Sequence, residues 1–148
     1  MKLLILNGPN LNLLGQREPA LYGAQTYSDL VRFLRAQAER LGCAIEVRQS
    51  NHEGVLVDWI QEASGQFDGI ILNAAAYTHT SIALLDALLA VGLPTVEVHL
   101  TVPEKREPFR RVSYLRSACV AVFSGHGFDS YRLAMETLCG MPSKAAPQ

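Results

Sequence analysis

The sequence has little of what marks several large classes of protein. Its 148 residues carry a formal net charge of −1, which gives no electrostatic reason to expect a nucleic acid or an anionic membrane as a partner. No apolar run approaches the ~20 residues that a membrane-spanning helix needs. Because 49% of the residues are hydrophobic, the chain can bury a substantial core, and an intrinsically disordered protein is excluded.

Cysteine and histidine are too few and too scattered to indicate a metal site. The cysteines are odd in number and lack the spacing of metal ligands: Cys43, Cys119 and Cys139. The histidines fall in four separate segments: His52, His79, His99 and His126. A metal ion needs three or four convergent ligands, so we expect none. Reduced thiols, and a first segment too short for a signal-peptide core, predict a cytoplasmic protein.

Short apolar runs alternate with amphipathic stretches along the whole chain. The runs predict strands over residues 3–7, 44–49, 69–74, 95–99 and 119–124, and the stretches predict helices over 26–41, 53–63, 80–91 and 128–138. Strands and helices that alternate in this way predict a parallel sheet with helices on both faces, in the strand order 2-1-3-4-5. We expect a single domain over 1–140 and a flexible tail over 141–148.

In an open parallel sheet, ligands bind beyond the carboxyl ends of the strands, so the segments that follow the strands are examined first. The segment after the first strand, residues 8–23, is long and rich in Asn, Gly and Pro, and it contains Arg17 and Tyr22. It could form a lid that carries both residues to the site. Alternatively, Arg17 is a solvated side chain and Tyr22 packs the loop against the protein.

Further polar residues follow the third and fourth expected strands. Asn73 ends one strand, His79 precedes the next helix, and Arg110 and Arg111 lie beyond the fourth strand. Glu97 and His99 are two residues apart on a strand, so they share a face, and the carboxylate could fix the tautomer and orientation of the imidazole.

Each of these residues taken singly could be an ordinary satisfied polar group. Together, at three neighbouring strand ends, they indicate proton transfer on an anionic, hydroxyl-rich substrate rather than acyl transfer.

The helix expected near residues 81–92 is apolar almost all round, and Asp86 is its only charged residue. Such a helix is buried on most of its faces, and in a small chain a subunit interface explains this readily. Asp86 is then either a surface aspartate or a residue that reaches the site of a neighbouring subunit.

Four stretches resemble the signatures of type II 3-dehydroquinate dehydratases. They are LILNGPNLNLLGQREPALYG (4–23), NAAAYTHTSIALLDAL (73–88), VEVHL (96–100) and KREPFRRVSY (105–114). The resemblance implies a flavodoxin-like fold, no cofactor and a homo-oligomer, a dodecamer of four trimers. It also implies a lyase that removes water from 3-dehydroquinate by anti elimination through an enolate, giving 3-dehydroshikimate. Such a lyase serves the shikimate pathway of aromatic amino acid biosynthesis or quinate catabolism.

The resemblance also implies roles for individual residues. Tyr22 is the base that removes the C2 proton, and Arg17 favours its tyrosinate form. His99 is the general acid for the departing hydroxyl, with Glu97 as its orienting partner. Asn10 holds the water that stabilises the enolate. Substrate contacts are implied for Asn73, His79 and Arg110, for the backbone N–H groups of Leu100 and Thr101, and for Asp86 of a neighbouring subunit.

The loop after His99 departs from the family's pattern. The family usually continues with a Ser-Asn pair, whereas this chain has Leu100, Thr101, Val102 and Pro103, and a proline lacks a backbone donor. This difference keeps an alternative open, namely a non-catalytic flavodoxin-like relative that binds a small acid or a partner protein.

Overall fold

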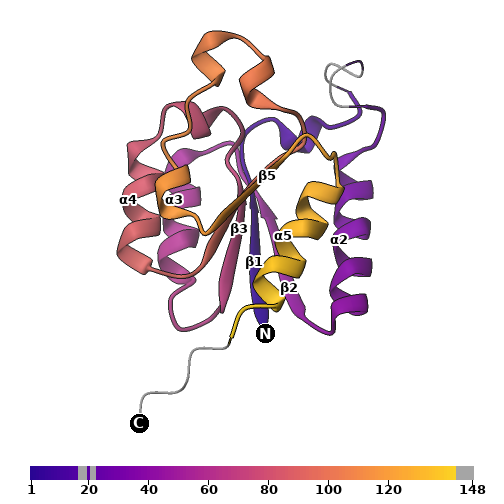
Figure 1. Cartoon of the computed structure of the whole chain (residues 1–148), viewed down its shortest axis with the longest axis vertical. Helices are drawn as coiled ribbons and strands as arrows, with labels where there is room; N and C mark the ends of the chain where they lie inside the picture. The colour runs from indigo at the N-terminus through magenta and orange to yellow at the C-terminus, as the bar shows by residue number, and fades with distance from the viewer. Residues whose placement is uncertain (17–19, 21–22, 143–148) are drawn as a thin grey trace.

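The chain folds into three layers, with a parallel β-sheet between two pairs of helices (Figure 1). The computed structural model describes residues 1–16, 20 and 23–142. The five strands lie in the order β2-β1-β3-β4-β5, so the predicted doubly wound, flavodoxin-like order is confirmed. The strands are β1 (Lys2–Asn7), β2 (Ala44–Gln49), β3 (Gly69–Asn73), β4 (Thr95–His99) and β5 (Ala121–Ser124).

Two helices cover each face of the sheet (Figure 1). On one face lie α2 (Tyr27–Leu41) and α5 (Asp129–Cys139), and on the other lie α3 (Glu53–Glu62) and α4 (Ile82–Val91). The central strand β1 shows why its apolar run is continuous: Leu3 and Ile5 pack into the first layer of core, whereas Leu4 and Leu6 pack into the second. No helix in the described part of the chain is long and apolar enough to cross a membrane.

Local signals in the sequence set both ends of α2. Thr26 caps α2 by accepting a hydrogen bond from the backbone N–H of Asp29, whose carboxylate bonds back to the N–H of Thr26. Gly42 ends the helix at φ 69°, a left-handed conformation that glycine adopts without strain.

Two boundaries differ from the prediction by two residues, and several others differ by one. Helix α4 begins at Ile82 rather than at residue 80, because the hydroxyl of Ser81 accepts the hydrogen bond of the Leu84 N–H. His79 therefore ends a short 3-10 turn instead of adjoining the helix. Strand β5 begins at Ala121 rather than at residue 119, because a further 3-10 turn runs up to Ala118.

In the described part of the chain, five 3-10 turns lie in the segments that follow β1, β3 and β4, and none of them was predicted. They are η1 (Leu11–Leu13), η2 (Ala75–His79), η3 (Pro103–Lys105), η4 (Pro108–Arg110) and η5 (Arg116–Ala118). Proline opens η3 and η4, where its fixed φ and missing N–H are tolerated. Turns η1 to η4 lie toward the top of Figure 1, whereas η5 lies beside α4.

A buried hydrogen-bond network joins the ends of β1 and β3 to α5. The hydroxyl of Tyr131 donates to Oδ1 of Asn7 (2.6 Å) and accepts from Nδ2 of Asn73 (2.9 Å). All three side chains are almost fully buried. Burial raises the pKa of Tyr131, so its hydroxyl stays a neutral donor. The network fixes the orientation of both asparagine amides.

Gly8 allows the chain to leave β1 next to β3. Its N–H donates to the carbonyl of Asn73 (2.8 Å), and an added Cβ would stand only 2.5 Å from the carbonyl oxygen of Ala74. Only glycine fits this close approach of two backbones.

We predict that Tyr131→Phe lowers the free energy of unfolding by about 1–3 kcal/mol, because two buried amides each lose a partner. Urea unfolding followed by circular dichroism measures the change. The matched control is Tyr114→Phe, at a tyrosine that is 42% exposed. Equal stabilities of the Tyr131 variant and the wild type would contradict the prediction.

Candidate active site

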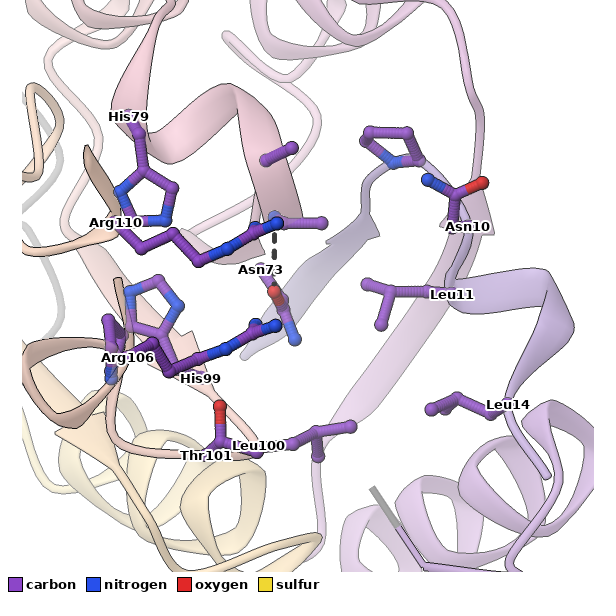
Figure 2. A pocket seen from close by; sticks show the side chains of 14 residues that line it. Asn10, Leu11, Leu14, Asn73, His79, His99, Leu100, Thr101, Arg106 and Arg110 are labelled. Carbon is purple, nitrogen blue, oxygen red and sulfur yellow. Dashed lines mark hydrogen bonds between the residues drawn. The ribbon is translucent and has the colours of Figure 1, made fainter. Parts of the chain in front are cut away.

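A pocket of about 260 Å³ opens beyond the carboxyl ends of β1, β3 and β4 (Figure 2). This is the edge of the sheet at which the sequence places its polar segments. Seven of the predicted site residues line the pocket: Asn10, Asn73, His79, His99, Leu100, Thr101 and Arg110. The segments after three different strands therefore converge on one cavity.

Three other predicted residues are placed differently or not described. Asp86 is exposed on α4 and does not line the pocket of its own chain. Arg17 and Tyr22 lie outside the described residues. Their predicted roles as activator and base therefore stay predictions.

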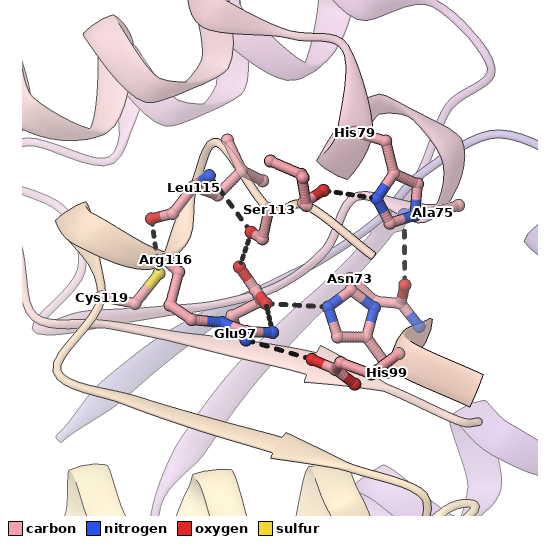
Figure 3. A network of polar contacts seen from close by, with 11 residues as sticks. Asn73, Ala75, His79, Glu97, His99, Ser113, Leu115, Arg116 and Cys119 are labelled. Atoms are coloured by element: carbon pink, nitrogen blue, oxygen red, sulfur yellow. Dashed lines mark hydrogen bonds and ion pairs between the residues drawn. The ribbon is translucent and has the colours of Figure 1, made fainter. Parts of the chain in front are cut away.

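Glu97 lies behind His99 on β4, as their spacing predicts (Figure 3). Nε2 of His99 donates to Oε2 of Glu97 over 2.8 Å. Because a carboxylate only accepts, Nε2 carries a hydrogen, and Nδ1 is the ring nitrogen that remains for a ligand. The pair can thus present an imidazole whose tautomer and orientation are fixed.

The carboxylate of Glu97 has two more donors. Ser113 donates to its Oε1 (2.5 Å), and Nη2 of Arg116 donates to its Oε2 (3.0 Å). Glu97 is only 1% exposed, and burial alone would raise its pKa. The hydrogen bonds from His99, Ser113 and Arg116 outweigh burial, so the pKa of Glu97 is lowered and the group is ionised at neutral pH.

His79 is held by the backbone that follows η4. Its Nδ1 lies 2.7 Å from the carbonyl oxygen of Val112 and must donate to it. Partial burial lowers the pKa of His79, and the hydrogen bond to Val112 opposes this only in part. His79 is therefore neutral at pH 7, with Nε2 as an acceptor.

The two asparagines of the pocket are fixed by their surroundings. Nδ2 of Asn73 donates to the hydroxyl of Tyr131, and Oδ1 of Asn73 accepts from the N–H of Ala75 (3.2 Å). Asn10 adopts φ 70°, a left-handed conformation that asparagine tolerates better than most residues. Its backbone N–H donates to Oδ1 of Asn51 (3.0 Å), so the turn that carries its side chain is tied to the end of β2.

Two guanidinium groups give the pocket a positive potential. Arg106 and Arg110 both line it, and no acidic side chain does among the lining residues that the structure describes. Arg110 is oriented by Glu107, whose carboxylate accepts from its Nε (2.9 Å). Such a pocket fits an anionic ligand, because a guanidinium stays charged and can bind a carboxylate with two parallel hydrogen bonds.

Sequence reasoning missed Arg106, Ser113 and Arg116. It instead singled out Arg111, which is exposed and whose Nε bonds to the carbonyl of Arg106. No periodicity distinguishes the arginines of this loop, because the path through η3, η4 and η5 decides which of them enter the pocket. A possible signal for Arg116 was that the buried Glu97 needed a cationic partner.

The arrangement suits acid–base chemistry on an anion. It offers a carboxylate-backed imidazole, a neutral second imidazole, two amides and two guanidinium groups around one cavity. The thiol of Cys119 is a poor nucleophile, because burial raises its pKa to about 12. In the part of the chain that the structure describes, no cluster of three or more His, Cys, Asp or Glu residues could hold a metal ion.

Comparisons with known proteins identify the family of this chain. The family model described as dehydroquinase class II matches residues 1–139. The 3-dehydroquinate dehydratase of Prochlorococcus marinus (strain MIT 9313) is 58% identical over 138 residues, which cover 93% of each chain. That of Phenylobacterium zucineum (strain HLK1) is 55% identical over 137 residues, covering 93% of this chain and 94% of the relative.

A solved structure leads to the same family. The type II dehydroquinase from Butyrivibrio crossotus superposes with a TM-score of 0.92 at 41% identity, over 93% of this chain and 97% of that one. These identities extend over nearly the whole length of each protein. This chain belongs to the class II dehydroquinase family.

Proposed function

We propose that this chain is a hydro-lyase that converts 3-dehydroquinate to 3-dehydroshikimate by anti elimination of water through an enolate. The observation that carries the proposal is the buried Glu97–His99 pair beside a pocket with two guanidinium groups, in a chain of the class II dehydroquinase family. The substrate is a hydroxylated carboxylate with a ketone, which requires an anion site and a proton donor for the leaving hydroxyl.

In this mechanism His99 protonates the hydroxyl as it leaves C1. The ionised Glu97 stabilises the imidazolium that serves as the acid, because the two charges are buried together. Arg106 and Arg110 bind the substrate's negative charge, and Asn73 and His79 bind its hydroxyl groups. The backbone N–H groups of Leu100 and Thr101 are further donors.

The C2 proton goes to Tyr22 in the proposed mechanism. A free phenol has a pKa of about 10, so a tyrosine base near neutral pH needs a cationic neighbour, and Arg17 has that role. Asn10 would hold the water that stabilises the enolate oxygen. Tyr22 and Arg17 both belong to the segment after β1. In the proposed mechanism this segment would close over bound substrate and exclude water.

We expect purified protein to convert 3-dehydroquinate with a rise in ultraviolet absorbance from the conjugated enone product, in the presence of EDTA. Tyr22→Phe and His99→Ala should each reduce kcat by about 10²–10⁴-fold, because each removes a proton-transfer group. Tyr114→Phe is the control at an exposed tyrosine. A flat trace from folded wild-type protein would instead favour a non-catalytic small-acid-binding protein.

We also propose a homo-oligomer, a dodecamer of four trimers, in which Asp86 reaches a neighbouring site. Ile82, Asp86 and Leu89 share one face of α4 through their i, i+4, i+7 spacing, and the two apolar side chains are 49% and 60% exposed. An exposed apolar face that holds a single carboxylate fits an interface between copies.

Co-expression of two inactive variants tests this arrangement. Asp86→Ala and His99→Ala should each be inactive alone, whereas a mixed assembly regains intact sites, about a quarter of them if mixing is random and Asp86 acts in trans. Analytical ultracentrifugation gives the assembly size in parallel. No recovery in assembled mixtures would contradict action in trans, and a monomeric wild type would contradict the oligomer.

A further inference from the structure

Arg116 connects two carboxylates with the two branches of its guanidinium group. Its Nη2 donates to Oε2 of the buried Glu97 (3.0 Å), and its Nη1 donates to Oε1 of Glu104 (3.1 Å). Glu104 belongs to η3, directly after Pro103, which lines the pocket. One side chain therefore joins the residue behind His99 to the wall of the pocket.

The branch on Glu97 meets the same oxygen that His99 uses (Figure 3). Oε2 of Glu97 thus accepts from an imidazole and from a permanently charged guanidinium group at once. Among the described residues, its other oxygen accepts from the neutral hydroxyl of Ser113 alone. Arg116 is the one partner among these three whose charge does not change with pH.

We propose that Arg116 is a positioning residue for the reaction: it keeps the Glu97 carboxylate ionised behind His99 and anchors the pocket wall through Glu104. This inference rests on the proposed function for its kinetic consequences, but the state of the carboxylate can be measured without turnover. Arg116 itself is not among the residues that line the pocket, and it acts through Glu97.

Several ionisable groups face Glu97 from the elements packed around it. They are His99 on β4, Arg116 in η5, Cys119 after η5 and His79 in η2, with Glu104 of η3 on the far side of the guanidinium group. The thiol of Cys119 stays neutral because its pKa is raised to about 12. Between pH 4 and 8 this thiol therefore does not change the charge near Glu97.

The kinetic test compares Arg116→Gln with Arg116→Lys. The Gln variant removes the positive charge beside Glu97, so the pKa of Glu97 rises. As the pH is lowered, the carboxylate of the variant is then protonated earlier than that of the wild type, and activity falls at a higher pH. We expect the acid limb of the kcat profile to move upward by about one pH unit. We also expect kcat at neutral pH to fall on the order of tenfold. The Lys variant keeps the charge and should restore the wild-type limb, although it cannot bridge both carboxylates.

Glu104→Gln removes the ion pair of Arg116 with Glu104 and leaves its ion pair with Glu97, so it tests the two contacts separately. This variant keeps the contact between Arg116 and Glu97, so the pH profile of kcat should match the wild type. KM should rise severalfold, because the pocket wall loses its ionic link. Arg40→Gln is the matched control, since Arg40 also bridges to a glutamate, Glu136 of α5, remote from the pocket.

The ¹³C chemical shift of the Glu97 side-chain carboxyl, assigned with Glu97→Gln, reports ionisation without substrate. It should titrate at higher pH in Arg116→Gln than in the wild type or in Arg116→Lys. Identical titrations in folded variants would overturn the proposal. If the wild type lacks turnover yet the shift occurs, the proposed function fails while the role of Arg116 on Glu97 stands.

Discussion

The parallel register of the sheet is the constraint on which the site depends. It pairs Asn7 of β1 with Asn73 of β3, and Leu72 of β3 with Glu97 of β4, so polar side chains meet at one edge. Both faces of the sheet are covered, and these side chains are buried. A buried donor or acceptor without a partner costs about 1–3 kcal/mol, so the polar groups that stand there must satisfy one another. The hydrogen bonds that orient the site residues therefore also satisfy the buried polar groups of the sheet edge.

The distribution of charge within the site separates two tasks. The guanidinium groups of Arg106 and Arg110 line the cavity, whereas the carboxylate of Glu97 is recessed behind His99 and surrounded by donors. An anionic ligand thus meets positive charge, and the negative charge that supports the acid is kept away from it. A chain with a net charge of −1 can in this way present a locally positive pocket.

The parts of the structure that could be predicted from the sequence are those with a regular hydrophobic pattern or a local capping signal. The five strands, the Thr26 cap and the Gly42 stop follow from local patterns, and the Glu97–His99 pair follows from the alternation of a strand. The path of residues 100–118 has no period, because it consists of three short 3-10 turns joined by extended links. Ser113 and Arg116 reach Glu97 only through that path. The roles of Tyr22 and Arg17 come from the family resemblance alone.

The hydroxyl of Tyr131 lies between two strand ends, and its bond to Asn7 spans 124 positions of the chain. Strand β1 leaves the ribosome before α5, yet the hydrogen bonds that Tyr131 makes to the amides of β1 and β3 form only when α5 packs against the sheet. Such long-range closure is slow compared with local helix formation. A nascent or truncated chain can therefore hold its central strands without a finished pocket. Packing of α5, rather than formation of the central strands, is therefore the step that completes the orientation of Asn73 in the pocket.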